Sequence, residues 1–209
     1  MSAPRAIFLD RDGTINAMVY HPDRSLVDSP VNPNEFRLLP GVGEAIGKIN
    51  AVGLLVVVVS NQPGVAKRKF TVELLDAITQ KMHQDLEAFG AKIDAVFYCL
   101  HHPEAVLDEY RMRCECRKPK PGLLLRGADA LGIDLQRSYM VGDAITDVQA
   151  GAMSGCRTVW LGPGQYHMRG LMDREGIQPD HIAAGLHEAV DLILGEERDA
   201  WRSSSTRPV

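Results

Sequence analysis

The sequence predicts a doubly wound α/β fold, in which a mostly parallel sheet carries helices on both faces. Short apolar segments alternate along the chain with longer segments of helical periodicity. The most continuously apolar segment, Leu54–Val59, is typical of a strand buried on both faces of a parallel sheet. Polar residues directly follow several such segments, and the carboxyl ends of parallel strands are where ligands bind.

The apolar segments predict five strands and a weaker sixth. The five are Ala6–Leu9, Leu54–Val59, Ala95–Tyr98, Ser138–Val141 and Thr158–Leu161, and the weaker one lies near His181. The predicted helices are Val42–Val52, Val72–Phe89, Gly122–Leu131, Asp147–Ser154 and Leu186–Leu194. Alternation of this kind implies right-handed crossovers within one domain, which we expect over residues 1–201.

Three segments do not fit the alternation. Residues 16–39 contain three prolines and are expected to form a long loop over the carboxyl edge of the sheet. Residues 99–116 are expected to form an inserted metal-binding loop, for reasons given below. The serine-rich tail, 202–209, is expected to be disordered.

Composition limits the classes of function. The 209 residues are 45% hydrophobic and 24% charged, as in a soluble globular protein. The net charge of −4 argues against a non-specific nucleic-acid binder, although local basic residues could still bind a small anion. The longest apolar stretch, Gly53–Val59, is too short to span a bilayer, and no signal-peptide pattern precedes the first strand. We therefore expect a cytoplasmic protein without a membrane partner.

An Asp-Arg-Asp-Gly-Thr stretch begins directly after the first predicted strand. Asp10 and Asp12 can point to the same side of a strand exit, and Gly13 allows a tight bend. One carboxylate could attack a phosphate ester, while the other protonates the leaving oxygen and then activates water. A divalent cation would have to offset the repulsion between carboxylate and phosphate. Taken alone, a solvated acidic turn explains this stretch about equally well.

Candidate phosphate ligands follow two later segments. Ser60 and Asn61 end the 54–59 strand and could hold phosphoryl oxygens, although for this piece alone an ordinary turn is favoured. Arg117 and Lys118 lie in a turn that prolines stiffen. Lysine supplies a point charge for the phosphate and arginine a fork for a second anionic group. A solvated basic loop is about as good an explanation of this turn in isolation.

Two further aspartates, Asp143 and Asp147, follow the 138–141 strand. One could bind a metal and the other could support it from behind. Mg²⁺ prefers few carboxylates together with water and substrate oxygens, which fits Asp10, Asp143 and a backbone carbonyl. A helix N-cap explains either aspartate nearly as well. The occurrence of all these motifs, in order and after successive strands, favours a joint site for phosphoryl transfer.

Three of the four cysteines lie close together in the 99–116 segment. Two short pairs, separated by twelve residues, offer a tetrahedral Cys₃His set typical of structural zinc. The candidate ligands are Cys99, His101, Cys114 and Cys116. His102 is an alternative to His101, and buried free cysteines are the alternative to zinc. Zinc would fold this loop and orient Arg117 and Lys118, which follow it immediately.

With these residues together, the chain resembles phosphatases of the haloacid dehalogenase (HAD) superfamily. Within them it is similar to the bacterial heptose bisphosphate phosphatases and the related histidinol phosphatases. The similarity rests on FLDRDGTIN at 8–16, SNQPG at 60–64, the segment 98–122 and YMVGD at 139–143. It implies a Rossmann-like core with loop insertions in place of a large cap domain.

The resemblance also implies a role for each candidate residue. Asp10 would be the nucleophile and Asp12 the general acid and base. Ser60 and Lys118 would steady the phosphoryl group. Substrate would be contacted by Asn61, Gln62 and Arg117. Mg²⁺ would be held by Asp10, the Asp12 carbonyl and Asp143, with Asp147 in support, and Zn²⁺ by Cys99, His101, Cys114 and Cys116.

The main hypothesis is a Mg²⁺-dependent phosphatase that removes the 7-phosphate of D-glycero-D-manno-heptose 1,7-bisphosphate. Histidinol phosphate or another small sugar phosphate is the alternative substrate, and a catalytically silent binding module is a remote alternative. A phosphatase for nucleic-acid ends ranks last, because the sequence predicts no basic groove with stacking aromatics. A monomer is favoured. Ala144, where heptose bisphosphatases often carry lysine, and the long 16–39 loop both bear on substrate choice.

Overall fold

The computed structural model describes residues 3–22, 25–162 and 166–205. Its centre is a six-stranded parallel sheet with the strand order β5-β4-β1-β6-β7-β8. The strands are β1 Ala6–Leu9, β4 Leu55–Asn61, β5 Ala95–Cys99, β6 Tyr139–Gly142, β7 Arg157–Leu161 and β8 His181–Ala183. Strand β1 lies between β4 and β6, with Leu9 beside Val58 and Val141. The carboxyl ends of these three strands therefore meet at the middle of one edge.

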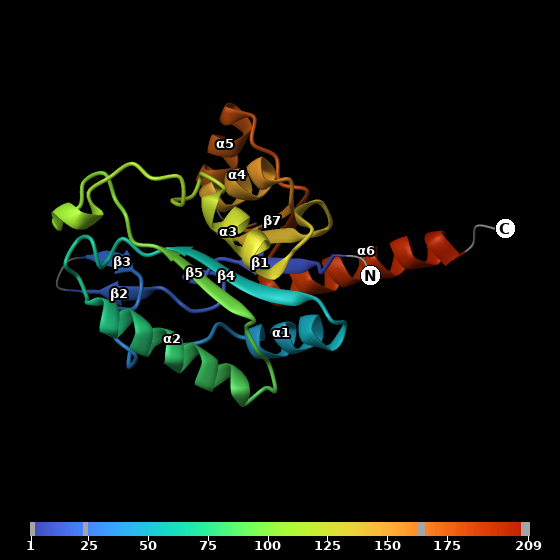
Figure 1. Cartoon of the computed structure of the whole chain (residues 1–209), viewed down its shortest axis with the longest axis horizontal. Coiled ribbons are helices and arrows are strands. Elements are labelled where there is room, and N and C mark those ends of the chain that lie inside the picture. The colour runs from blue at the N-terminus through green and yellow to red at the C-terminus, as the bar shows by residue number, and fades with distance from the viewer. Residues whose placement is uncertain (1–2, 23–24, 163–165, 206–209) are drawn as a thin grey trace.

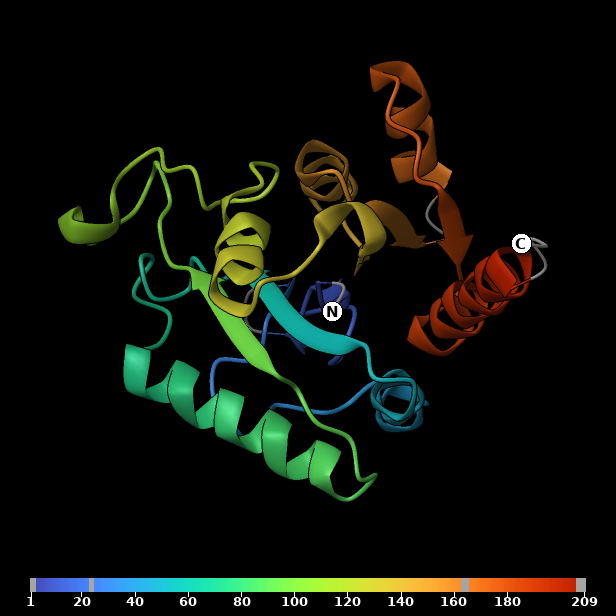
Figure 2. The same cartoon turned by 45° about the vertical axis from the view of Figure 1, so that its right-hand side comes forward.

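Helices cover both faces of this sheet (Figures 1 and 2). On one face lie α1 Val42–Ala51, α2 Val72–Glu87 and α6 Leu186–Ser205, and on the other lie α3 Gly122–Leu131, α4 Ile145–Ser154 and α5 Tyr166–Glu175. No large cap domain is present among the described residues. The predicted doubly wound fold is confirmed.

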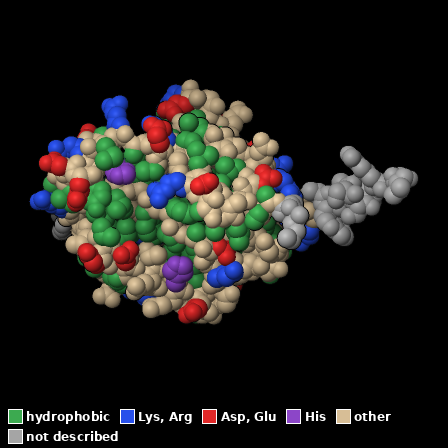
Figure 3. All heavy atoms as spheres, viewed as in Figure 1, with side chains coloured by type: hydrophobic (Ala, Val, Ile, Leu, Met, Phe, Trp, Pro, Cys, Tyr) green, Lys and Arg blue, Asp and Glu red, His purple; other side chains and the backbone are tan. Residues whose placement is uncertain are grey.

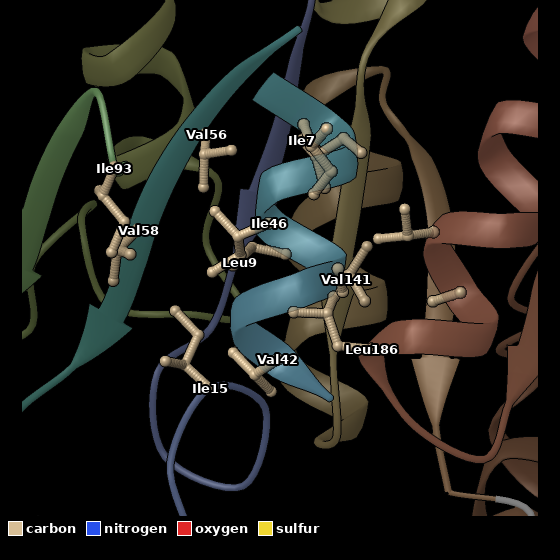
Figure 4. Packing of buried hydrophobic residues seen from close by; sticks show 14 of the residues in the cluster. Ile7, Leu9, Ile15, Val42, Ile46, Val56, Val58, Ile93, Val141 and Leu186 are labelled. Atoms are coloured by element: carbon tan, nitrogen blue, oxygen red, sulfur yellow. The ribbon is translucent and has the colours of Figure 1, made fainter. Parts of the chain in front are cut away.

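Alternation along the strands explains how both faces are buried. In β1, Ile7 and Leu9 join the cluster around α1, whereas Ala6 and Phe8 face α3 and α4. Figure 4 shows the first cluster, to which β4 and the flanking segments also contribute. A strand with helices on both sides needs apolar residues at every position, which accounts for the unbroken apolar run of β4.

Three elements differ from the sequence-based prediction. The 16–39 segment is not only loop, because β2 Val19–His21 and β3 Leu26–Asp28 pair as an antiparallel hairpin. Helix α5 was missed because its sequence is polar and contains a glycine. Helix α6 passes the predicted end and enters the segment for which we expected disorder, and residues 206–209 lie outside the described residues.

Contacts at Glu196 and Glu197 account for the first part of the extension of α6. Glu196 accepts hydrogen bonds from the Tyr139 hydroxyl and the Arg157 guanidinium, and Glu197 pairs with Arg5. These contacts hold the helix beyond Leu194 against the amino ends of the strands. Because they are polar, the sequence shows no apolar periodicity there from which the helix could be predicted.

Charged side chains of both signs are interspersed on the face seen in Figure 3. On that face no extended field of one sign is available to attract an anion. Among the residues described, no helix combines the length and the apolar character needed to cross a bilayer.

Candidate active site

The acidic residues predicted from separate motifs converge at the carboxyl edge of the sheet. Asp10 follows β1, and its backbone N–H donates to the Val141 carbonyl at 3.0 Å. Asp143 follows β6, and Asp147 lies in the first turn of α4. One carboxylate oxygen from each of the three aspartates lies within 4.8 Å of the other two. The strand order alone brings them together, because β1 and β6 are neighbours.

Gly13 makes this approach possible. Its φ is +85°, a conformation that side chains disfavour, and a Cβ atom there would lie 2.2 Å from a carboxylate oxygen of Asp143. The turn after β1 can therefore pass over Asp143 only because residue 13 has no side chain.

We expect Gly13→Ala to lower kcat/KM by about 10²-fold. The new methyl group would overlap the Asp143 carboxylate and push it out of its position in the site. Gly155→Ala is the matched control, since Gly155 also has a φ of +85° but only a distant Gln136 atom, 3.9 Å away, in its space. Both variants should lose about 1–2 kcal/mol of unfolding free energy from backbone strain. Equal kinetics in the two variants would contradict the role given to Gly13.

Lys118 is buried and joins two of the aspartates. Its Nζ lies 2.9 Å from Asp10 Oδ1 and 2.6 Å from Asp147 Oδ1. Its backbone is fixed by the side chain of Asn61, at the end of β4. The Lys118 N–H donates to Asn61 Oδ1 at 3.0 Å, and Asn61 Nδ2 donates to the Lys118 carbonyl at 3.1 Å. Asn61, predicted as a substrate contact, thus holds the lysine in place.

Asp147 and Asp143 are held by groups behind the site. Asp147 is buried, and its Oδ2 accepts a hydrogen bond from the Ala144 N–H at 3.0 Å, which caps α4. The Asp143 backbone carbonyl accepts a hydrogen bond from Trp160 Nε1 at 2.9 Å. Trp160 was not anticipated, and its place in a buried strand gave no signal of this contact.

The balance of charge suits a divalent cation. Burial, together with the Asp10 and Asp147 carboxylates, raises the pKa of Asp143 to about 7. Burial also raises the pKa of Asp147 to about 6. Burial alone would lower the pKa of Lys118, but the carboxylates of Asp10 and Asp147 raise it. Three carboxylates around one ammonium leave surplus negative charge, and an all-oxygen ligand set fits Mg²⁺.

The Asp12 carboxylate lies beside this cluster and is surrounded by hydrogen-bond donors. Arg11 Nη2 lies 3.0 Å from each of its oxygens, Gln62 Nε2 donates to Oδ2 at 2.7 Å, and Asn16 Nδ2 donates to Oδ1 at 3.0 Å. Gln62 Nε2 also lies 3.2 Å from Ser60 Oγ. Gln62, predicted as a substrate contact, therefore touches two other candidate residues. Sequence reasoning did not single out Arg11 or Asn16, although Arg11 lies inside the Asp-Arg-Asp motif.

The four predicted zinc ligands form one cluster. The three sulfur–sulfur distances are 3.2, 3.3 and 3.6 Å, and His101 Nδ1 lies 3.3 Å from the Cys116 sulfur. A tetrahedral site with Zn–S bonds of about 2.3 Å has sulfur–sulfur edges of about 3.8 Å. A disulfide would require about 2.05 Å, and all four cysteines of the chain are free thiols. The donor set and spacing therefore fit zinc.

His101, and not His102, faces the cysteines. His102 Nδ1 instead accepts a hydrogen bond from the Glu104 N–H at 3.1 Å. Burial and the Cys116 thiol raise the pKa of the Cys99 thiol, so a bound cation would be needed to keep that sulfur ionised. The His101 carbonyl accepts a hydrogen bond from Arg117 Nη1 at 3.4 Å, which ties the cluster to the basic turn.

We expect Cys116→Ser to reduce bound zinc from one ion per chain to almost none, and to lower kcat/KM at least about tenfold. Zinc is lost because one of its four ligands is removed. Activity falls because Cys116 lies two residues before Lys118, so a loosened loop would no longer hold the lysine in place. Metal analysis and phosphate-release kinetics measure the two effects. Cys156→Ala is the control, because Cys156 lies outside the cluster and should leave the zinc content unchanged. Full activity in a zinc-free Cys116→Ser protein would refute the link between loop and lysine.

A cavity of about 300 Å³ opens beside the zinc loop. Its basic lining residues are Arg113, Arg117, Lys118 and Lys120. Lys118 connects it to Asp10, and Lys120 also pairs with Glu115. The cavity could bind an anionic group of a molecule whose other end lies at Asp10.

The parallel sheet, the Asp10–Lys118 pair and the carboxylate cluster define a phosphatase of the HAD type. A family model described as HAD-hydrolase-like matches residues 115–189. The D-glycero-β-D-manno-heptose-1,7-bisphosphate 7-phosphatases of Salmonella typhi and Escherichia coli K12 are each 41% identical over 153 residues. The match covers 73% of this chain and 77% and 76% of theirs. The Vibrio cholerae enzyme of that name is 39% identical over 156 residues, or 75% of this chain and 80% of its own.

Solved structures give the same result. The D,D-heptose 1,7-bisphosphate phosphatase of B. bronchiseptica, complexed with magnesium and phosphate, has a TM-score of 0.75 and 32% identity. The match covers 92% of this chain and 99% of that one. A putative HAD-like phosphatase from Mesorhizobium loti has a TM-score of 0.73 and 30% identity, covering 91% and 86%. The chain belongs to the family of the HAD-type heptose bisphosphate phosphatases, and the resemblance inferred from its motifs is confirmed.

Proposed function

We propose that this chain hydrolyses the 7-phosphate of D-glycero-β-D-manno-heptose 1,7-bisphosphate through an aspartyl-phosphate intermediate. The observation that carries the proposal is the buried Lys118, held between Asp10 and Asp147 at the carboxyl edge of the sheet. The names of its relatives support the substrate, and the magnesium and phosphate bound to the B. bronchiseptica enzyme support the chemistry.

In the first step, an Asp10 oxygen bonds to phosphorus and the bond from phosphorus to the sugar oxygen breaks. Asp12 gives its proton to that leaving oxygen. In the second step, Asp12 takes a proton from the attacking water, the new phosphorus–oxygen bond forms, and Asp10 is released. Lys118 and the Ser60 hydroxyl hold the oxygens of the transferring group.

Asp10, the Asp12 carbonyl and Asp143 would hold Mg²⁺, which would supply positive charge that offsets the repulsion between carboxylate and phosphate. Asp147 supports this set by holding Lys118 and the start of α4. The four ligands of the 99–116 loop would hold Zn²⁺, and a Cys₃His donor set of this kind would give it a structural role.

The basic cavity favours a bisphosphate over histidinol phosphate. The 1-phosphate of the heptose would bind near Arg117 and Arg113, which line the cavity. Histidinol phosphate has no second phosphate, and its ammonium and imidazole groups would be repelled or unmatched in the same cavity. It stays the second candidate because its reacting group is also a primary phosphate ester.

The test is phosphate release with Mg²⁺ from both heptose bisphosphate anomers, heptose 7-phosphate and histidinol phosphate. We expect the highest kcat/KM for the β-bisphosphate, and we expect Arg117→Gln to raise KM for it far more than for heptose 7-phosphate. A higher kcat/KM for histidinol phosphate would overturn the substrate, while leaving the chemistry at Asp10 intact.

We further propose that residues 1–201 act as one catalytic domain, as a monomer and in the cytoplasm. The free thiols of all four cysteines support a reducing compartment. Light scattering of the purified protein and fractionation of the producing cells test these two points.

A further inference from the structure

We propose that Arg11 is a positioning residue, which fixes the Asp12 carboxylate in the orientation needed to protonate the leaving oxygen. The inference rests on the proposed function, because it assigns Arg11 a part in the reaction of Asp12. Arg11 lies between the two catalytic aspartates in the sequence, yet its side chain turns away from solvent and is fully buried.

The contact between Arg11 and Asp12 is a two-pronged one. Arg11 Nη2 lies 3.0 Å from both carboxylate oxygens, and Nε lies 3.2 Å from Oδ1. Such a fork fixes the plane of a carboxylate as well as its distance, which a single donor cannot do. The rotation of the Asp12 side chain is therefore set by the guanidinium.

Arg11 is itself held on two further sides. Nη2 donates to Gln62 Oε1 at 3.1 Å, and the guanidinium lies 5.5 Å from the centre of the Tyr98 ring. The Tyr98 hydroxyl lies 2.9 Å from Thr79 Oγ1, so the ring is anchored to α2. This chain of contacts connects the Asp12 carboxylate to β5 and α2, well behind the catalytic edge.

Asp12 is the only carboxylate that pairs with Arg11 among the described residues, and Arg11 Nη1 has no hydrogen-bond partner among them. A buried arginine is costly unless its charge is matched, so a purely structural ion pair would be expected to satisfy more of its donors. Its polar contacts lead instead to Asp12 and to Gln62, which also donates to Asp12.

The experiment compares two leaving groups. A sugar alkoxide needs a proton to depart, whereas p-nitrophenolate departs without one. We expect Arg11→Lys and Arg11→Met to lower kcat/KM about 10²-fold for the heptose bisphosphate and less than about threefold for p-nitrophenyl phosphate. A general loss of structure would lower both equally, so the ratio isolates the effect on Asp12.

Arg126→Gln is the matched control, because Arg126 also lies over an aromatic ring of β5, 5.8 Å from the centre of Phe97, at a distance from the catalytic edge. It should leave both rates unchanged. In an Asp12→Asn background, the Arg11 substitutions should have little further effect on the bisphosphate. Gln62→Met, which removes no charge, should show the same leaving-group preference in a weaker form, and it serves as the test if the Arg11 variants do not fold.

Equal losses on the two substrates, or losses that add to that of Asp12→Asn, would overturn the role of Arg11. Failure of the proposed function itself would be recognised from the Asp12→Asn variant. If Asp12→Asn lowered kcat/KM, which excludes the shared hydrolysis of the phosphoenzyme, equally on both substrates, Asp12 would not be the general acid, whatever Arg11 does.

Discussion

Replacement of Asp10 by asparagine is expected to reduce kcat on the heptose bisphosphate by about 10⁴-fold or more, because the amide cannot attack phosphorus. The variant should fold normally. Lys118 keeps its 2.6 Å pair with Asp147, and one of three crowded negative charges is removed. We therefore expect its unfolding free energy to change by less than about 1 kcal/mol.

Phosphate release and urea unfolding measure the two quantities on the same preparation. Asp129→Asn makes the same chemical change at an exposed position of α3 and should behave as the parent in both assays. Labelled phosphoryl transfer from substrate to the parent protein, absent in Asp10→Asn, would identify the intermediate. Substantial turnover by Asp10→Asn would exclude an aspartyl phosphate at this position.

Replacement of Lys118 by methionine is expected to affect both activity and stability. Methionine keeps much of the volume but leaves the Asp10 and Asp147 carboxylates, both paired with Nζ, without their cation. Breaking a buried ion pair in this way costs about 3–5 kcal/mol of unfolding free energy. Loss of the charge that faces the phosphoryl group should lower kcat by a further factor of about 10²–10³.

Lys120→Met is the matched control for stability. Lys120 lies two residues away and pairs with Glu115 at the surface, where such pairs contribute about 0–1 kcal/mol. Similar destabilisation of the two variants in chemical denaturation would show that the Lys118 ion pairs contribute no more to the unfolding free energy than a surface pair does.

The sequence predicted the parts of the site that depend on strand order. Asp10, Ser60 and Asp143 each follow or end an apolar strand, and parallel strands necessarily bring such residues to one edge. The zinc ligands were predictable for a related reason, since short pairs of sulfur and imidazole donors on one loop have few other uses.

The remainder depends on side-chain direction, which strand order does not determine. Arg11 could have pointed to solvent, and only the packing of Tyr98 beside it shows that it faces inward. Asn61 and Gln62 stay predicted substrate contacts, and the hydrogen bonds of their amides to Lys118 and Asp12 could not be foreseen from strand order. The β2–β3 hairpin was missed because strands of three residues are too short to show a periodicity.

The hydrogen bonds between Asn61 and the Lys118 backbone have a consequence for how such enzymes diverge. They fasten the end of the zinc loop to β4, while Cys99 fastens its beginning to β5. The twelve residues between the two ligand pairs can therefore vary in sequence without moving the lysine. Arg113 belongs to that stretch and lines the basic cavity. New substrate preferences can thus evolve on this loop while the hydrolytic chemistry is inherited unchanged.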